Sequence, residues 1–203
     1  MTTPIILASS SPYRRALLQR LGLTFECMTP DIDETPKPGE LCPALAARLA
    51  LEKAEAIAKS HPDALVIGSD QTASIKGQRL SKPGNHQVAT AQLKACADNS
   101  VIFYTGLALV QHKRGFSQTR IEPYTVHFRA LSDAQIDAYL RKEQPYDCAG
   151  SFKCEGLGIS LFKALEGRDP TALEGLPLIA LTDLLAEAGV DILDTISGKT
   201  LRP

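Results

Sequence analysis

The sequence predicts a mixed α/β sheet with helices on both of its faces. Apolar segments typical of strands alternate with helical periodicity through the first hundred residues, and two long strand-like stretches then flank a short turn. Polar residues collect where predicted strands end, at 9–15 and again at 69–71. Ligands bind at the carboxyl ends of strands in open α/β sheets, so these two segments mark a candidate site.

The first half of the chain contains clear punctuation signals. Ser11 and Pro12 predict a helix start, because serine caps helices and proline fits the first helical position, and Gly22 ends that helix. Segment 30–43 holds four prolines and several acids, so we expect an exposed loop that is ordered by what it binds. The other elements expected here are strands at 5–8, 23–28 and 65–70, a helix at 44–60, and a hairpin at 73–80.

The second half predicts a long hairpin followed by helices. Ser132 begins a helix there, with Gln135 in the capping-box position. The remaining expected elements are helices at 85–96 and 177–188, strands at 101–111 and 116–128, and a glycine-containing loop at 146–158. We expect one domain over residues 1–203, in which the tail from 191 to 203 is loosely packed.

Composition narrows the class of protein. The 203 residues are 44% hydrophobic with a net charge of −1, which suits one well-formed core and gives no basic footprint for nucleic acid or an anionic membrane. No apolar run approaches the roughly 20 residues that span a bilayer. The first residues lack the basic segment of a signal peptide, so we expect a cytoplasmic protein. Five scattered cysteines without a C-x-x-C pair favour reduced thiols over disulfides or zinc.

The segment after the first strand could bind an anion. Ser9 and Ser11 offer hydroxyls, Arg14 and Arg15 offer guanidiniums, and the helix N-terminus offers backbone N–H groups. The pattern matches neither a Walker loop nor a dinucleotide fingerprint. An ordinary capped helix with surface arginines explains the spacing equally well.

Carboxylates and lysines form a second group of candidates. Glu34 lies on the proline-rich loop, and Asp70 follows a hydrophobic strand. Carboxylates of this kind can bind magnesium or act as a general base on water. Lys53, within a predicted helix, and Lys82, before a proline, could each bind a phosphate. Taken singly, each lysine is more often a solvated surface residue.

Eight short motifs occur in order between about residues 5 and 187. They are Ala8–Arg15, Asp33–Glu34, Glu52–Ala54, Gly68–Asp70, Lys82–Pro83, Tyr104–Gly106, Ala149–Ser151 with Glu155–Gly156, and Gly175–Pro177. In order and spacing they resemble the Maf-like proteins, nucleotide pyrophosphatases once described as septum-formation inhibitors. Each motif is weak alone, and the combination is specific.

The resemblance implies an elongated α/β unit of the inosine-triphosphatase type, with two lobes around a cleft, and a homodimer. It implies hydrolysis between the α- and β-phosphates with magnesium, manganese or cobalt. Asp70 would be the proton acceptor, although the sequence leaves open a role as metal ligand, and Glu34 would help with metal or water. The implied triphosphate-binding residues are Ser9, Arg14, Arg15, Lys53 and Lys82.

Three positions separate branches within this family: Tyr13, Gln71 and Glu155. They are similar to the YceF-like branch, described as 7-methyl-GTP pyrophosphatases. An electron-rich ring at Tyr13 can stack on the cationic methylated guanine, and a carboxylate at Glu155 can accept from its N1–H and N2–H. We therefore expect hydrolysis of 7-methyl-GTP to 7-methyl-GMP and diphosphate.

Three alternatives stay open at this point. Tyr13 could merely pack against the protein while Glu155 is solvated. The chain could be a dTTP- or UTP-type pyrophosphatase of the same family. It could also be a regulator of cell division that binds a nucleotide without cleaving it.

Overall fold

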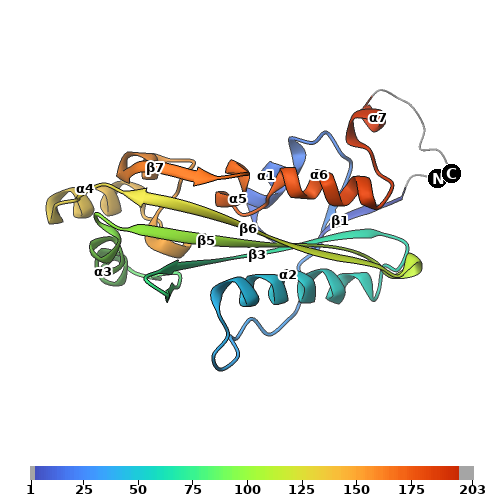
Figure 1. Cartoon of the computed structure of the whole chain (residues 1–203), viewed down its shortest axis with the longest axis horizontal. Helices are drawn as coiled ribbons and strands as arrows, with labels where there is room; N and C mark the ends of the chain where they lie inside the picture. The colour runs from blue at the N-terminus through green and yellow to red at the C-terminus, as the bar shows by residue number, and fades with distance from the viewer. Residues whose placement is uncertain (1–2, 197–203) are drawn as a thin grey trace. The chain divides into compact units, whose positions relative to one another are not determined.

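Seven strands pair in the order β2-β1-β3-β5-β6-β7, with β4 beside β3, in the computed structural model, which describes residues 3–196 (Figure 1). The strands are β1 Ile5–Leu7, β2 Glu26–Cys27, β3 Leu65–Ile75, β4 Gln78–Leu80, β5 Ser100–Gln111, β6 Phe116–Phe128 and β7 Phe162–Gly167. β1 runs parallel to β2 and β3, whereas β4 and β7 run antiparallel to their partners β3 and β6. The sheet is mixed, which confirms the predicted α/β class.

The helices begin at the signals that the sequence contains. They are α1 Pro12–Gln19, α2 Cys42–Ala58, α3 His86–Cys96, α4 Asp133–Glu143, α5 Pro170–Leu173, α6 Leu178–Glu187 and α7 Ile192–Ile196. Ser11 caps α1 through its side chain, and Pro12 occupies the first turn. Ser132 and Gln135 form the predicted capping box of α4. These caps supply acceptors for backbone N–H groups that have no partner within the helix.

The chain divides into two compact units. The first comprises Met1–Gln71, Thr105–Glu122 and Asp169–Pro203, and the second comprises Thr72–Tyr104 and Pro123–Arg168. Each unit has its own buried residues and is described separately below.

The first unit buries both faces of its strands. In β1, Ile5 and Leu7 belong to one buried cluster with residues of α1 and α6, whereas Ile6 belongs to another with residues of α2. Neighbouring side chains of a strand point to opposite faces, so the two clusters lie on opposite sides of the sheet. Figure 1 shows α2 on one side of this part of the sheet and α1 with α6 on the other. The prediction of helices on both faces is confirmed for this unit.

Two glycines let α2 lie very close to the sheet. A Cβ atom added to Gly68 would lie 2.1 Å from the Ala50 carbonyl oxygen, and one added to Gly106 would lie 2.1 Å from the Ala46 carbonyl oxygen. Atoms cannot approach so closely, so glycine is required at these points of β3 and β5. The close approach also sets how far the side chains of α2 must reach to contact β3.

The second unit has an aromatic core. Phe152 packs edge-on against Phe103, Phe128 and Phe162, with ring centroids 4.8–5.6 Å apart. Edge-to-face pairs are worth about 0.5–1.5 kcal/mol beyond the area that they bury. Phe152 lies in the predicted glycine loop, which is therefore anchored to the core of this unit.

The clearest error of the sequence prediction concerns β3. The sequence predicts a strand that ends at Asp70 and a separate hairpin, whereas β3 continues through to Ile75 and pairs there with β4. Asp70 therefore lies within a strand. Its polar side chain and that of Gln71 interrupt the apolar run, yet both have partners in the structure, so the strand tolerates them.

Other elements differ from the predictions in smaller ways. β7 and the four-residue α5 were not predicted, because β7 is largely exposed and lacks an apolar alternation. β2 has two residues where six were expected, 23–28. In the tail that was expected to be loose, residues 192–196 form α7 and Ile192 is buried, while 197–203 lie outside the described residues.

Candidate active site

The turn between β1 and α1 is shaped by its two serines. Ser9, which is buried, accepts a hydrogen bond through Oγ from the Ser11 backbone N–H at 3.1 Å. Ser11 Oγ accepts from the Arg14 backbone N–H at 3.4 Å. Both hydroxyls act as acceptors within the turn, so each keeps its own hydrogen to donate to an anion. Tyr13 and Arg15 are exposed on the same first turn of α1.

Arg14 is oriented by a distant segment of the chain. Its Nε donates to the Gly175 carbonyl oxygen at 2.8 Å, which leaves the two terminal nitrogens for other partners. Burial lowers the pKa of Arg14, and the nearby charges of Asp70 and Glu34 act in the opposite direction. An arginine remains protonated in proteins under such conditions, so the site contains a fixed positive charge.

Lys53 joins the two predicted carboxylates. Its Nζ lies 2.6 Å from Asp70 Oδ1 and 2.8 Å from Glu34 Oε1. The side chains of Lys53 and Asp70 are only 8% and 12% exposed, whereas that of Glu34 is 60% exposed. Charges removed from water are stable only when they are paired, so Lys53 and Asp70 depend on each other. The structure therefore brings together three of the four residues that the sequence predicts as catalytic.

The loop that carries Glu34 is bound to α2 by an arginine that the sequence prediction missed. Arg48 contacts Glu40 through two nitrogens, at 2.7 and 2.8 Å, and donates to the Thr35 carbonyl oxygen at 3.2 Å. It also pairs with Glu52 one turn further along α2, at 2.9 Å. The Arg48–Glu52 spacing of four residues was a visible signal. The contact with Glu40 had no such signal, because it depends on the path of the loop.

The hydrogen bonds from Arg48 strongly affect Glu40. Together with the backbone N–H of Lys37, they lower the pKa of Glu40 to about 2. Glu40 is therefore ionised across the physiological range. The loop thus has a charged attachment point six residues after Glu34.

The two faces of β3 serve different contacts. Gly68 and Asp70 face α2, as their contacts with Ala50 and Lys53 show. Residues 69 and 71 alternate to the other face. There Ser69 Oγ contacts the carbonyl oxygens of Gly106 and Gly175, both at 2.9 Å. Gln71 Nε2 lies near the carbonyl oxygens of residues 172 and 173 and the hydroxyl of residue 105.

Two predicted residues belong to the second unit. Lys82 is exposed and follows β4. Glu155 is exposed between the short 3₁₀ turns Ala149–Ser151 and Leu157–Leu161, and its Oε2 accepts a weak hydrogen bond from the Cys154 thiol at 3.4 Å. Both remain predictions, as does the role of each residue in the first unit.

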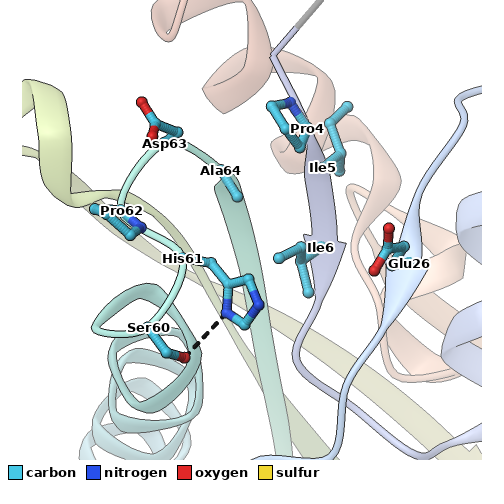
Figure 2. A pocket seen from close by; sticks show the side chains of 9 residues that line it. All are labelled: Pro4, Ile5, Ile6, Glu26, Ser60, His61, Pro62, Asp63 and Ala64. Carbon is cyan, nitrogen blue, oxygen red and sulfur yellow. Dashed lines mark hydrogen bonds between the residues drawn. The ribbon is translucent and has the colours of Figure 1, made fainter.

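A cavity of about 380 Å³ in the first unit lies away from these residues (Figure 2). Its walls include Pro4 and Ile5 at the start of β1, whereas Ser9 follows the end of that strand. The His61 ring faces this cavity and contacts Ser60 Oγ at 3.0 Å. The candidate site and this cavity are therefore separate features. No helix within residues 3–196 is long and apolar enough to cross a membrane.

Comparisons with known proteins agree with the motifs. A family model described as "Maf-like protein" matches residues 4–188. A 7-methyl-GTP pyrophosphatase from Thiobacillus denitrificans is 55% identical over 193 residues, which cover 95% of this chain and 96% of the relative. Proteins of the same name from Nitrosococcus oceani and Pseudomonas syringae are 56% and 55% identical, over 93% of this chain and over 95% and 98% of their own lengths.

Proposed function

The chain belongs to the Maf-like family, and we propose that it hydrolyses 7-methyl-GTP to 7-methyl-GMP and diphosphate as a housecleaning activity against modified nucleotides. The relatives that carry this name match nearly the whole chain at 55–56% identity. The structural observation that supports the proposal is the Lys53 ammonium held between Asp70 and Glu34, in the same charge cluster as Arg14.

Positive charges are what this reaction needs most. Cleavage of a phosphoanhydride depends on positioning the phosphates and stabilising their charge, with little covalent chemistry for the protein to perform. In the proposal Arg14 and Arg15 bind the triphosphate through their guanidiniums, and Lys53 and Lys82 provide point charges. The residues that complete the grip are the hydroxyls of Ser9 and Ser11.

Asp70 is the proposed proton acceptor. The hydrogen bond from Lys53 uses Oδ1 and orients the carboxylate, so Oδ2 can take the proton of the attacking water. Position within β3, rather than on a loop, keeps this side chain rigid. A positioned base contributes typically 10²–10⁴-fold to a rate.

The carboxylates also fit a divalent cation, magnesium, manganese or cobalt. No group of three His, Cys, Asp or Glu residues that could hold a metal occurs among residues 3–196. Magnesium is usually bound by one or two carboxylates together with substrate phosphates and water, and Glu34 and Asp70 supply two. When bound, the metal would neutralise charge on the phosphates. Lys53 shows that a cation between these two carboxylates is stable.

Base recognition is assigned to exposed side chains. Tyr13 would stack on the cationic methylated base, a contact worth about 0.5–2 kcal/mol, and Glu155 would accept from the Watson–Crick edge. Gln71, the third specificity position, is considered below. The homodimer and the cytoplasmic location that were expected from the sequence stay predictions.

Pyrophosphate release from 7-methyl-GTP, GTP, dTTP, UTP and CTP, with magnesium and then with EDTA, tests the proposal. We expect 7-methyl-GTP to lead by ten-fold or more, in keeping with about 1.5–3 kcal/mol from a charge-assisted hydrogen bond. A lead by dTTP or UTP would favour the pyrimidine-type pyrophosphatase. Binding without cleavage of any nucleotide would favour the regulator of cell division.

A further inference from the structure

We propose that Gln71 is a positioning residue for the triphosphate grip, acting through the turn 169–175 and the Gly175 carbonyl on the Arg14 guanidinium. This inference rests on the proposed function, and it gives Gln71 a role other than the base reading that the sequence predicts. The argument depends on the face of β3 from which Gln71 projects, on the direction of its hydrogen bonds, and on the contacts of the turn.

Gln71 faces away from the proposed base catalyst. Asp70 projects toward Lys53 on α2, and the next residue of a strand projects to the opposite face. Ser69 shares the face of Gln71, and its hydroxyl contacts Gly175. The neighbour of Gln71 on this face is therefore the turn 169–175.

The direction of the hydrogen bonds fixes the orientation of the Gln71 amide. Its Nε2 lies 2.8 Å from the Ala172 carbonyl oxygen and 3.1 Å from that of Leu173, and carbonyl oxygens can only accept. Thr105 Oγ1, 3.0 Å away, gives its own hydrogen to the Ala172 carbonyl oxygen at 2.8 Å, so it also accepts from Gln71. Both N–H groups of the amide are therefore directed at the turn and its neighbour Thr105.

Buried Asp169 holds the other end of the turn. Its Oδ1 accepts from the Thr171 backbone N–H at 2.9 Å and from the Thr171 hydroxyl at 2.6 Å, and its Oδ2 accepts from the Ile179 N–H at 2.7 Å. The turn then reaches Gly175, whose φ of +105° suits glycine and strains other residues. Gln71 and Asp169 together determine where the Gly175 carbonyl points.

The Gly175 carbonyl in turn determines how Arg14 is presented. It accepts from Arg14 Nε at 2.8 Å, and this bond fixes the plane of the guanidinium. The two terminal nitrogens are then directed together, which is the arrangement that binds a phosphate through two parallel hydrogen bonds. Loss of the Gln71 contacts would loosen this plane without touching the substrate's base.

The test uses Gln71→Met, which keeps the length of the side chain and removes its donors. We expect KM for both 7-methyl-GTP and UTP to rise about ten-fold, while kcat changes less and the preference between the two substrates stays within two-fold. In an Arg14→Met background, Gln71→Met should cause no further loss, because the residue through which it acts is gone. Thr105→Val, which removes one contact of the same turn, should show the same pattern more weakly if Gln71→Met folds poorly.

Calorimetric titration with inorganic triphosphate separates this inference from the proposed function, because it needs no turnover and no base. Weaker triphosphate binding by Gln71→Met, absent when Arg14 is also replaced, supports the positioning role even if the wild-type protein cleaves no nucleotide. A change of ten-fold or more in the preference between 7-methyl-GTP and UTP would overturn it in favour of base reading. Independent, multiplying losses from Gln71→Met and Arg14→Met would also overturn it.

Discussion

The two units differ in how their candidate residues are held. In the first unit, Lys53 and Asp70 are nearly buried and paired, and Arg14 is bound to a carbonyl oxygen. In the second unit, Lys82 and Glu155 are exposed. Groups that stabilise charge act best when their positions are set before the substrate arrives. The difference indicates that the chemistry common to all triphosphates is preorganised in the first unit, whereas discrimination between bases depends on exposed side chains.

Asp70→Asn is expected to have the largest effect. The amide cannot take a proton from water, so kcat should fall about 1,000-fold on every nucleotide, within the range for general bases, while binding is retained. Rapid-quench turnover and equilibrium binding of 7-methyl-GTP measure the two quantities. Asp63→Asn, which removes an exposed carboxylate paired with Lys113, is the matched control and should leave kcat unchanged. Full activity of Asp70→Asn would remove this residue from the mechanism.

Glu155→Gln tests the second half of the comparison. If the exposed carboxylate reads guanine, kcat/KM for 7-methyl-GTP should fall about 10- to 100-fold, and that for UTP should change little. Glu166→Gln, another exposed carboxylate of the second unit, is the control. Equal losses on the two nucleotides would show that Glu155 acts on the phosphates or on folding. The contrast between the units would then disappear.

Gly68→Ala should disturb the preorganisation of the first unit without removing any functional group. The added Cβ would overlap the Ala50 carbonyl oxygen and crowd Ala54, which is next to Lys53, so α2 must move away from β3. Overpacking of this kind costs about 1–3 kcal/mol of unfolding free energy, and we expect about a ten-fold loss of kcat as Lys53 moves from Asp70. Chemical denaturation and steady-state kinetics measure the two effects.

Gly106→Ala provides the matched comparison for that variant. It creates an equally close contact with Ala46, seven residues before Lys53 on the same helix. It should cost similar stability but less activity than Gly68→Ala. Equal losses of activity would mean that general loosening of α2, rather than the distance between Lys53 and Asp70, controls the rate.

The sequence predicted what depends on local signals and on short motifs. Ser11 with Pro12, and Ser132 with Gln135, marked helix starts because caps are local structures. The extent of β3 was wrong, because Asp70 is stable in a strand only through Lys53, seventeen residues away. The contact between Arg14 and Gly175 joins residues 161 positions apart, so no periodicity could reveal it. Long-range partners decide both the strand and the grip.

The smallest predicted effect concerns the attachment of the Glu34 loop to α2. Glu40 has a pKa of about 2 in the folded protein, chiefly because Arg48 donates to it. A carboxylate whose pKa is lower in the folded state stabilises the protein above its unfolded pKa, near 4.3, and this stabilisation is lost as the pH falls toward 2. The melting temperature of wild type should therefore exceed that of Glu40→Gln by a few degrees at pH 7, and the gap should close between about pH 4.5 and 2.

Glu52→Gln sharpens that experiment, since it removes the other partner of the same arginine. The Glu52 side chain is 38% exposed and that of Glu40 is 9% exposed, so water competes more for the Arg48–Glu52 pair and the change in melting temperature should be smaller. A gap between wild type and Glu40→Gln that stays constant from pH 7 to pH 2 would contradict the ionic origin of the attachment. A gap that closes, with KM for 7-methyl-GTP raised at pH 7, would show that the ordered loop presents Glu34 to the triphosphate, as the preorganised first unit requires.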